Sequence, residues 1–172
     1  DQSGLRLGSG QAIEAPAGCQ AVFDATSRGG AKAPASGGFA CTLRQPSGDG
    51  VAVSRVVDGD TIVIAGGERV RYIGMDTPEI SGRVEPFGPE ASAFNRKLVG
   101  GKSVRLEADA EERDQYDRLL RYVYVGGLLV NAELVREGYA WARAYPPNTR
   151  YRKCFEALEN EAREEKRGMW AR

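Results

Sequence analysis

The stretch "VAVSRVVDGDTIVIAGGERVRYIGM" (residues 51–75) carries the clearest strand pattern in the chain. Three runs rich in Val and Ile (51–57, 61–65 and 68–75) indicate β-strands, because branched side chains pack well on a pleated surface. Asp58-Gly59 separates the first two runs and Gly66-Gly67 separates the last two, and both dipeptides favour tight turns. The stretch therefore predicts three consecutive strands joined by short turns.

The rest of the chain adds two strands and three helices. Strands are predicted at 103–108 and 119–125, with a charged loop at 109–118 between them. Helices are predicted at 88–101, at 130–138 and from about 149 to 167; Asn131 is expected to open the second of them, and Gly138 to close it. Because the strands come first along the chain and the helices are interleaved later, the sequence predicts an α+β fold. Five strands of this size fit a small closed barrel such as the OB-fold.

The first fifty residues differ from this pattern. They contain 10 Gly, 3 Pro and 5 Ser, with few large apolar side chains. Such a composition buries too little surface to order itself. We therefore predict an irregular N-terminal extension (1–50) followed by one folded domain (51–172).

Composition and charge exclude several classes of protein. The chain has 24 Lys and Arg, 24 Asp and Glu, and no histidine. The missing histidine excludes Ser/His nucleophiles and His-ligated metals, and no apolar run approaches the roughly 20 residues of a membrane helix. Residues 51–172 hold 16 Arg against 4 Lys, and Arg forks suit phosphate or carboxylate.

Three cysteines, Cys19, Cys41 and Cys154, match no zinc-site spacing. In a secreted protein one pair could form a disulfide, with three pairings possible, whereas three unpaired thiols would suit a cytosolic chain. The first residue is Asp rather than Met, which suggests a processed or trimmed form. We expect a secreted protein, extracellular or periplasmic, and a monomer.

Carboxylates gather where the first and third predicted strands end. Asp60 follows the first turn, and Asp76 and Glu79 follow the third strand. Oxygen ligands of this kind suit Ca²⁺, and the forks of Arg71 and Arg118 match the oxygens of a phosphodiester. A cation, two arginines and a spare carboxylate together suit phosphoryl transfer, in which the carboxylate takes a proton from water.

Each feature also has a simpler interpretation when it is taken alone. Asp58-Gly59 is a turn, and residues 76–79 could cap a helix with Asp76 as N-cap. Residues 112–118 could be a solvated charged loop, and the aromatic side chains could belong to the core. The joint order and spacing of these features favours a functional site.

The sequence resembles the staphylococcal nuclease (thermonuclease) family across about 55–170. The matching segments are "VVDGDT" (56–61), "RYIGMDTPE" (71–79), "FGPEASAFNRKLV" (87–99), "DQYDRLLRYVYV" (114–125), "VNAELVREGYAW" (130–141) and "RGMW" (167–170). The resemblance implies an OB-like five-stranded barrel with three helices. It also implies a Ca²⁺-dependent nuclease that cleaves DNA and RNA, without regard to the sugar, to 3′-phosphate and 5′-hydroxyl products.

The resemblance further implies a role for each matching residue. Asp60 and Asp76 would ligate Ca²⁺ through carboxylates and Thr77 through its carbonyl. Glu79 would be the general base, while Arg71 and Arg118 would stabilise the transition state. Substrate contacts would come from Tyr116, Arg83 and Tyr145, and Asp114 would be a structural acid near the site.

Some positions depart from the family pattern. Gln115 replaces a phosphate-binding lysine, and loop 80–87 is short with Arg83 as its one basic residue. Together with the zero net charge, these changes predict weaker nucleic-acid binding than in basic members. Two alternatives to an enzyme are a nuclease-like barrel that only binds nucleic acid or protein, and a structural OB-fold domain with protein partners.

Overall fold

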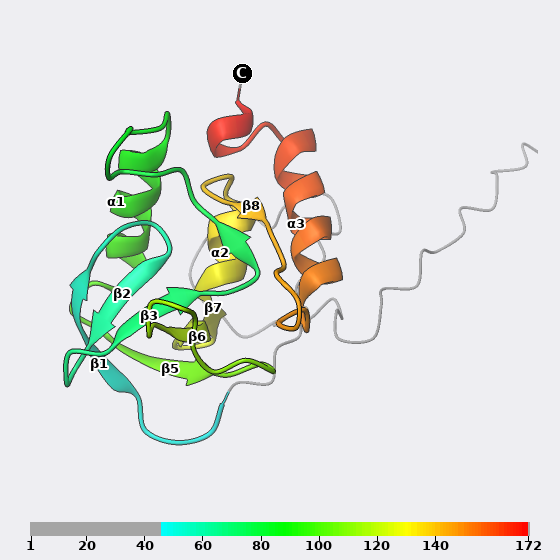
Figure 1. Ribbon diagram of the computed structural model, residues 1–172. Helices are drawn as coiled ribbons and strands as arrows, with labels where there is room; N and C mark the ends of the chain where they lie inside the picture. The colour runs from blue at the N-terminus through cyan, green and yellow to red at the C-terminus, as the bar shows by residue number, and fades with distance from the viewer. Residues whose placement is uncertain (1–45, 172) are drawn as a thin grey trace, which may run out of the picture.

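Five strands close into a barrel in the computed structural model, which describes residues 46–171 (Figure 1). The strands are β1 (Val51–Val56), β2 (Thr61–Ile64), β3 (Arg69–Tyr72), β5 (Ser103–Glu107) and β6 (Leu119–Val125). Antiparallel pairs join β1 to β2 and β5, β2 to β3, and β5 to β6, and the parallel pair of β3 with β6 closes the ring. The predicted five-stranded barrel of an α+β, OB-like fold is confirmed. The predicted irregular extension lies almost entirely outside the described residues.

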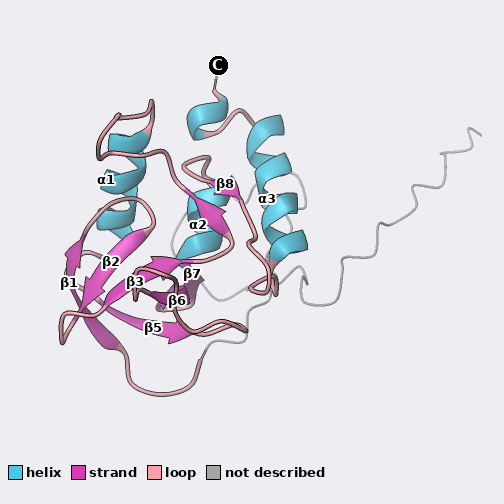
Figure 2. Cartoon of the chain, in the orientation of Figure 1, coloured by secondary structure: helices cyan, strands magenta, loops and turns pink. Residues whose placement is uncertain are grey.

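Three helices, α1 (Gly88–Val99), α2 (Val130–Arg136) and α3 (Arg152–Glu164), complete the predicted set. They lie together beyond one end of the barrel, with α2 between α1 and α3 (Figures 1 and 2). A short 3-10 helix, η1 (Gly168–Trp170), follows α3. No helix among residues 46–171 has both the length and the apolar character that a membrane crossing requires.

Branched and aromatic side chains fill the interior between the barrel and the helices. Ile62, Val70, Val123 and Phe155 are fully buried, and each such side chain contributes roughly 1.5–3 kcal/mol by leaving water. Two buried polar groups link this core to the turn before β2. The Tyr72 hydroxyl donates to Asn95 Oδ1 (2.8 Å), and Asn95 Nδ2 donates to the Asp58 carbonyl (2.9 Å). Helix α1 thereby fixes the turn that leads to Asp60.

The predicted third strand (68–75) is interrupted. β3 ends at Tyr72, and a separate strand β4 (Met75–Asp76) pairs with β8 (Trp141–Ala142). Gly74 lies between them with φ +83°, and a Cβ there would lie 2.5 Å from the ring of Phe155 on α3. The close approach of α3 turns the chain out of the barrel and toward β8.

The structure excludes the simpler alternative in which residues 76–79 cap a helix, and it shows that one expectation about a helix start was wrong. Asp76 belongs to β4, so residues 76–79 do not cap a helix, and α1 begins only at Gly88. Asn131 does not open α2, which has no side-chain cap. Its side chain is fully buried instead, where Oδ1 accepts from Val123 N (2.9 Å) and Nδ2 donates to the Ile73 carbonyl (2.9 Å). The buried amide therefore satisfies one backbone group of β6 and one of the segment between β3 and β4.

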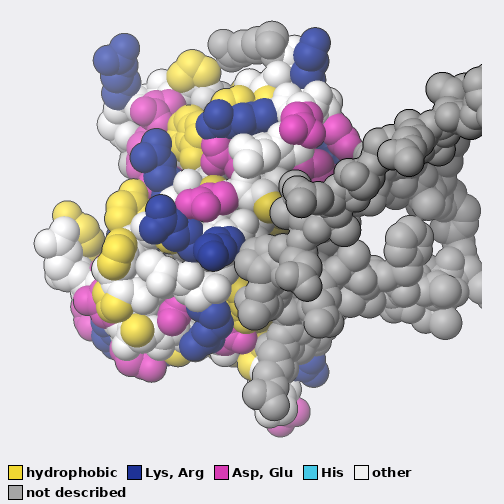
Figure 3. All heavy atoms as spheres, turned by 90° about the vertical axis from the view of Figure 1, so that its right-hand side faces the viewer, with side chains coloured by type: hydrophobic (Ala, Val, Ile, Leu, Met, Phe, Trp, Pro, Cys, Tyr) yellow, Lys and Arg dark blue, Asp and Glu magenta, His cyan; other side chains and the backbone are white. Residues whose placement is uncertain are grey.

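Charged side chains of both signs are mixed on the surface. Figure 3 shows Lys and Arg interspersed with Asp and Glu on the face that it presents. Many are paired, as in the ion pairs of Arg113 with Glu68 and of Arg121 with Glu112. This arrangement agrees with the zero net charge of the chain.

Candidate active site

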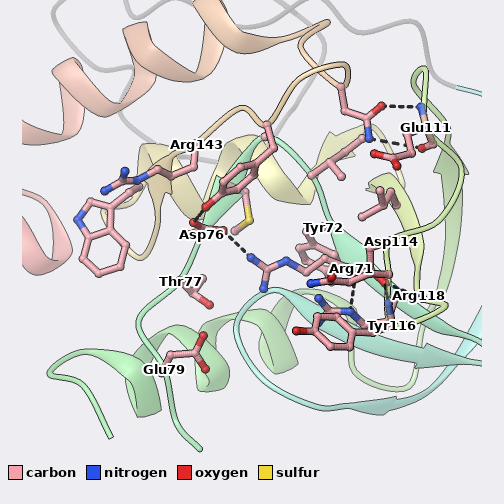
Figure 4. Close-up of a pocket in the computed structure, with 18 of the residues that line it drawn as sticks. Arg71, Tyr72, Asp76, Thr77, Glu79, Glu111, Asp114, Tyr116, Arg118 and Arg143 are labelled. Atoms are coloured by element: carbon pink, nitrogen blue, oxygen red, sulfur yellow. Dashed lines mark hydrogen bonds and ion pairs between the residues drawn. The ribbon is translucent and has the colours of Figure 1, made fainter. Parts of the chain in front are cut away.

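A pocket of about 630 Å³ opens where β3, β4, the loop 108–118 and the segment after β8 meet (Figure 4). Its walls carry most of the residues that the sequence singled out. These are Arg71, Asp76, Thr77, Glu79, Asp114, Tyr116, Arg118 and Tyr145. Asp60 reaches the same place by its ion pair with Arg71. Residues from five separate segments therefore converge on one cavity.

Arg71 joins the two aspartates predicted to bind metal. Its Nη1 forms an ion pair with Asp60 Oδ1, and its Nη2 lies 2.5 Å from Asp76 Oδ1. The side chain of Asp60 is almost fully buried, whereas those of Arg71 and Asp76 remain partly accessible. Two carboxylate oxygens thus already face a single positive charge.

Asp60 is held from its other side by Thr77. The backbone N–H and the hydroxyl of Thr77 donate to Asp60 Oδ2 at 3.1 and 3.0 Å. Burial raises the pKa of the Asp60 carboxyl, and the nearby Arg71 guanidinium opposes that rise. Burial alone would lower the pKa of Arg71, but Asp60 and Asp76 raise it overall, so its guanidinium stays charged.

Glu79 lies on the segment between β4 and α1, and a second glutamate fixes its backbone. The Glu79 N–H donates to Glu85 Oε2 (3.0 Å), and the Glu85 N–H donates to the Glu79 carbonyl (2.9 Å). A Cβ on Gly88 would lie 2.5 Å from that carbonyl, so the start of α1 packs directly on it. Glu85 was not predicted, because its contact is to backbone and no side-chain pattern in the sequence indicates it.

Asp114 organises the turn that presents Arg118 and Tyr116. Its Oδ1 accepts from the N–H groups of Tyr116 (2.9 Å) and Arg118 (3.0 Å), and its Oδ2 accepts from Arg118 Nε (2.7 Å). Burial opposes ionisation, but these hydrogen bonds from Arg118 and Tyr116 lower the pKa of Asp114 overall. The Arg118 guanidinium lies 5.5 Å from the centre of the Tyr116 ring.

The charged loop 109–118 is therefore more than a solvated loop. Asn148 Oδ1 accepts from the Glu111 N–H (2.8 Å), which ties the loop to the turn after β8. Arg113 pairs with Glu68 next to β3. Both links fix the wall that carries Arg118.

The opposite rim comes from the segment after β8. Tyr145 is 62% exposed, and its hydroxyl donates to Asp76 Oδ2 (2.5 Å), a bond that raises the pKa of Tyr145. Arg143 also lines the pocket, and Figure 4 shows Asp76 between Arg143 and the group of Arg71, Tyr116 and Arg118. Arg143 was missed, because no motif includes it. Arg83, predicted as a substrate contact, is not among the residues that line the pocket.

The donor set suits a hard divalent cation. Asp60 Oδ1 and Asp76 Oδ1 already converge on the cationic group of Arg71, and carboxylate oxygens are what Ca²⁺ prefers. Among residues 46–171 no group of three or more His, Cys, Asp or Glu side chains is arranged to hold a metal ion. The predicted set needs only two carboxylates, because its third protein ligand would be the Thr77 carbonyl.

Comparison with known proteins identifies the family of the chain. The family described as staphylococcal nuclease homologue matches residues 69–172. The chain is 44% identical over 131 residues to a protein named thermonuclease from Staphylococcus intermedius, covering 73% of this chain and 78% of that one. It is 39% identical over 125 residues to a thermonuclease of Staphylococcus hyicus (69% and 74% covered). It is 43% identical over 130 residues to endonuclease YncB of Bacillus subtilis (71% and 62% covered). The chain belongs to the staphylococcal nuclease family.

Proposed function

We propose that the protein is a Ca²⁺-dependent, sugar-nonspecific nuclease that converts DNA and RNA to 3′-phosphate and 5′-hydroxyl products. Membership of the family, with relatives named thermonuclease and endonuclease, makes the chain a nuclease that hydrolyses phosphodiester bonds. Its substrates are accordingly nucleic acids. Beyond nuclease activity, we propose that the metal is Ca²⁺, that either sugar is accepted and that the bond from phosphorus to the 5′ oxygen is the one cleaved.

One observation carries the proposal. Asp60 and Asp76 converge on Arg71 at a pocket that Glu79 and Arg118 also line. A domain that only binds nucleic acid needs cations, but it has no need for carboxylates beside them, since these repel phosphate. Carboxylates directed at the same pocket as two arginines suit a reaction at phosphorus.

The residues of the pocket divide the chemistry among them. Asp60, Asp76 and the Thr77 carbonyl would hold Ca²⁺, which supplies charge stabilisation at the phosphate oxygens when it is bound. Arg71 and Arg118 bind the phosphate and stabilise the added charge of the transition state. Asp114 Oδ2 accepts a hydrogen bond from Arg118 Nε. The two Nη nitrogens of Arg118 form no hydrogen bond to any residue between 46 and 171. They can therefore face the substrate.

Glu79 acts as the general base. It takes a proton from a water molecule whose oxygen forms the new bond to phosphorus. The bond from phosphorus to the 5′ oxygen breaks, and that oxygen takes up a proton from solvent. The reciprocal hydrogen bonds with Glu85 hold the backbone of Glu79 during this step.

We further propose a secreted monomer with one disulfide among its three cysteines. The proposal rests on the family resemblance and on the number of cysteines. We place Cys154, which is buried on α3, in that pair, with either Cys19 or Cys41, both outside the described residues, as its partner. Mass spectrometry of the unreduced protein after proteolysis would identify the pair.

The test is cleavage of plasmid DNA and of RNA by the purified protein, with Ca²⁺ and with EDTA. We expect EDTA to abolish cleavage and Glu79→Gln to lower the rate roughly 10²- to 10⁴-fold, which is the usual contribution of a general base. Glu90→Gln, an exposed change in the first turn of α1, is the matched control. If the wild-type protein cleaves nucleic acid no faster than Glu79→Gln at any Ca²⁺ concentration, a binding module is the better description.

A further inference from the structure

The two oxygens of Asp76 have different partners. Oδ1 faces Arg71 Nη2, and Oδ2 accepts a hydrogen bond of 2.5 Å from the Tyr145 hydroxyl. Asp60 Oδ1 contacts the other Nη nitrogen of the same guanidinium. The Tyr145 bond therefore holds Oδ2 and leaves Oδ1 as the oxygen of Asp76 that shares the Arg71 guanidinium with Asp60.

The fold brings Tyr145 to this position by its backbone. β8 pairs antiparallel with β4, with Trp141 opposite Asp76, and the Arg143 N–H donates to the Gly74 carbonyl (2.9 Å). The chain after β8 thus runs beside β4, and Tyr145 reaches across to Asp76. This contact is between elements that are 69 residues apart in sequence.

Tyr145 contributes little to the core. It is 62% exposed, and among the described residues its ring takes no part in an aromatic pair. Within residues 46–171 its side chain makes one hydrogen bond, which ends on the carboxylate predicted to bind metal. Because Tyr145 is exposed and its side-chain hydrogen bond ends on Asp76, it affects the orientation of Asp76 more than the stability of the barrel.

We propose that Tyr145 is a positioning residue for the metal site: its hydroxyl holds Asp76 Oδ2, so that Oδ1 is oriented for the cation. The inference rests on the proposed function, because it assumes that Asp60 and Asp76 bind Ca²⁺. It replaces the expectation that Tyr145 contacts the substrate. Hydrogen bonds that orient a ligating carboxylate typically change metal affinity roughly 10- to 100-fold when they are removed.

The experiment measures Ca²⁺ affinity by calorimetry without substrate, for the wild-type protein, Tyr145→Phe and Tyr116→Phe. Phe keeps the ring and removes only the hydroxyl, so thermal unfolding should be unchanged. We expect the dissociation constant for Ca²⁺ to rise about 10- to 100-fold in Tyr145→Phe. We expect no change in Tyr116→Phe, which alters a tyrosine of similar exposure that does not contact either aspartate.

Cleavage kinetics provide the second measurement. The Ca²⁺ concentration for half-maximal rate should rise in Tyr145→Phe by the same factor, and saturating Ca²⁺ should restore the wild-type rate and KM. Unchanged Ca²⁺ affinity in Tyr145→Phe, with a raised KM for nucleic acid, would overturn the inference and return Tyr145 to a substrate role. A wild-type protein that binds no Ca²⁺ would overturn the metal site itself, which is a different failure.

Discussion

The ionisable side chains of the pocket hold one another in position. Arg71 is fixed by Asp60 and Asp76, Arg118 by Asp114, and the backbone of Glu79 by Glu85. Fixed geometry matters for catalysis, because a displacement of about 1 Å at a reacting group can cost roughly 100-fold in rate. Residues that touch no substrate can therefore control the reaction by holding those that do.

Glu85 offers a test of this idea. In Glu85→Ala the Glu79 N–H loses its acceptor, so we expect kcat to fall about 10- to 100-fold. KM and Ca²⁺ affinity should hardly change, because Glu85 lies outside the predicted metal and phosphate contacts. Steady-state kinetics at saturating Ca²⁺ would measure both parameters.

Glu85→Gln is the control for this prediction. Its amide oxygen can still accept the bond from the Glu79 N–H (3.0 Å in the wild-type protein), so most of the rate should return. Equal losses in the Ala and Gln variants would mean that the charge of Glu85 matters rather than its hydrogen bond, and the positioning role would be wrong.

Among the contacts between elements, the one between Phe155 on α3 and Gly74, where the chain leaves β3, determines the path to the site. Gly74 has φ +83°, and a Cβ there would lie 2.5 Å from the Phe155 ring. A left-handed conformation costs a non-glycine residue roughly 1–2 kcal/mol, and overpacking costs roughly 1–3 kcal/mol more. The same break sends the chain into β4, which carries Asp76.

We therefore expect Gly74→Ala to lower the free energy of unfolding by about 2–5 kcal/mol in urea titrations. Gly67→Ala is the matched control, because Gly67 has φ +87° but nothing lies within 4 Å of the place that its Cβ would take. It should lose only the conformational cost, about 1–2 kcal/mol. Equal losses at the two positions would show that contact with Phe155 is not what requires glycine at 74.

Local patterns in the sequence predicted most of the elements. β6 was predicted at its observed bounds (119–125), and the Asp58-Gly59 turn joins β1 to β2 as expected, since alternation and turn residues act over a few positions. The break at Gly74 and the pairing of β4 with β8 were not predicted. Both depend on α3 and on a segment more than 60 residues away, which no local pattern encodes.

The candidate site likewise contains residues that local motifs predicted and residues that they did not. The motifs around Asp60, Arg71 and Asp76 predicted a set of side chains that the fold does bring together. Asn131 was misread as a cap, because its true partners are the distant groups of Val123 and Ile73. Glu85 was missed because its contact is to the backbone of Glu79, and Arg143 was missed because it belongs to no motif and reaches the pocket only through the pairing of β8 with β4.

For the whole molecule, binding of a polyanion must depend on local cations. The net charge is zero, and positive and negative side chains are mixed on the surface that Figure 3 shows. Such a surface does not concentrate nucleic acid by its long-range field. Weaker binding than by a basic family member at matched salt remains our expectation, and equal affinity would contradict it.

Substitution of Arg143 tests which cations attract the nucleic acid. Arg71 and Arg118 have carboxylate partners, whereas Arg143 lines the same pocket and its guanidinium makes no hydrogen bond or ion pair to any residue in 46–171. We expect Arg143→Ala to weaken oligonucleotide binding and to reduce the slope of log Kd against log salt by about 0.7–0.9, the loss of one phosphate contact. Binding would be measured in a Glu79→Gln background, so that the oligonucleotide stays intact. Arg55→Ala, an exposed change on β1 away from the pocket, should leave the slope unchanged. If both variants reduce the slope equally, the attraction is spread over the surface, and the pocket is not its source.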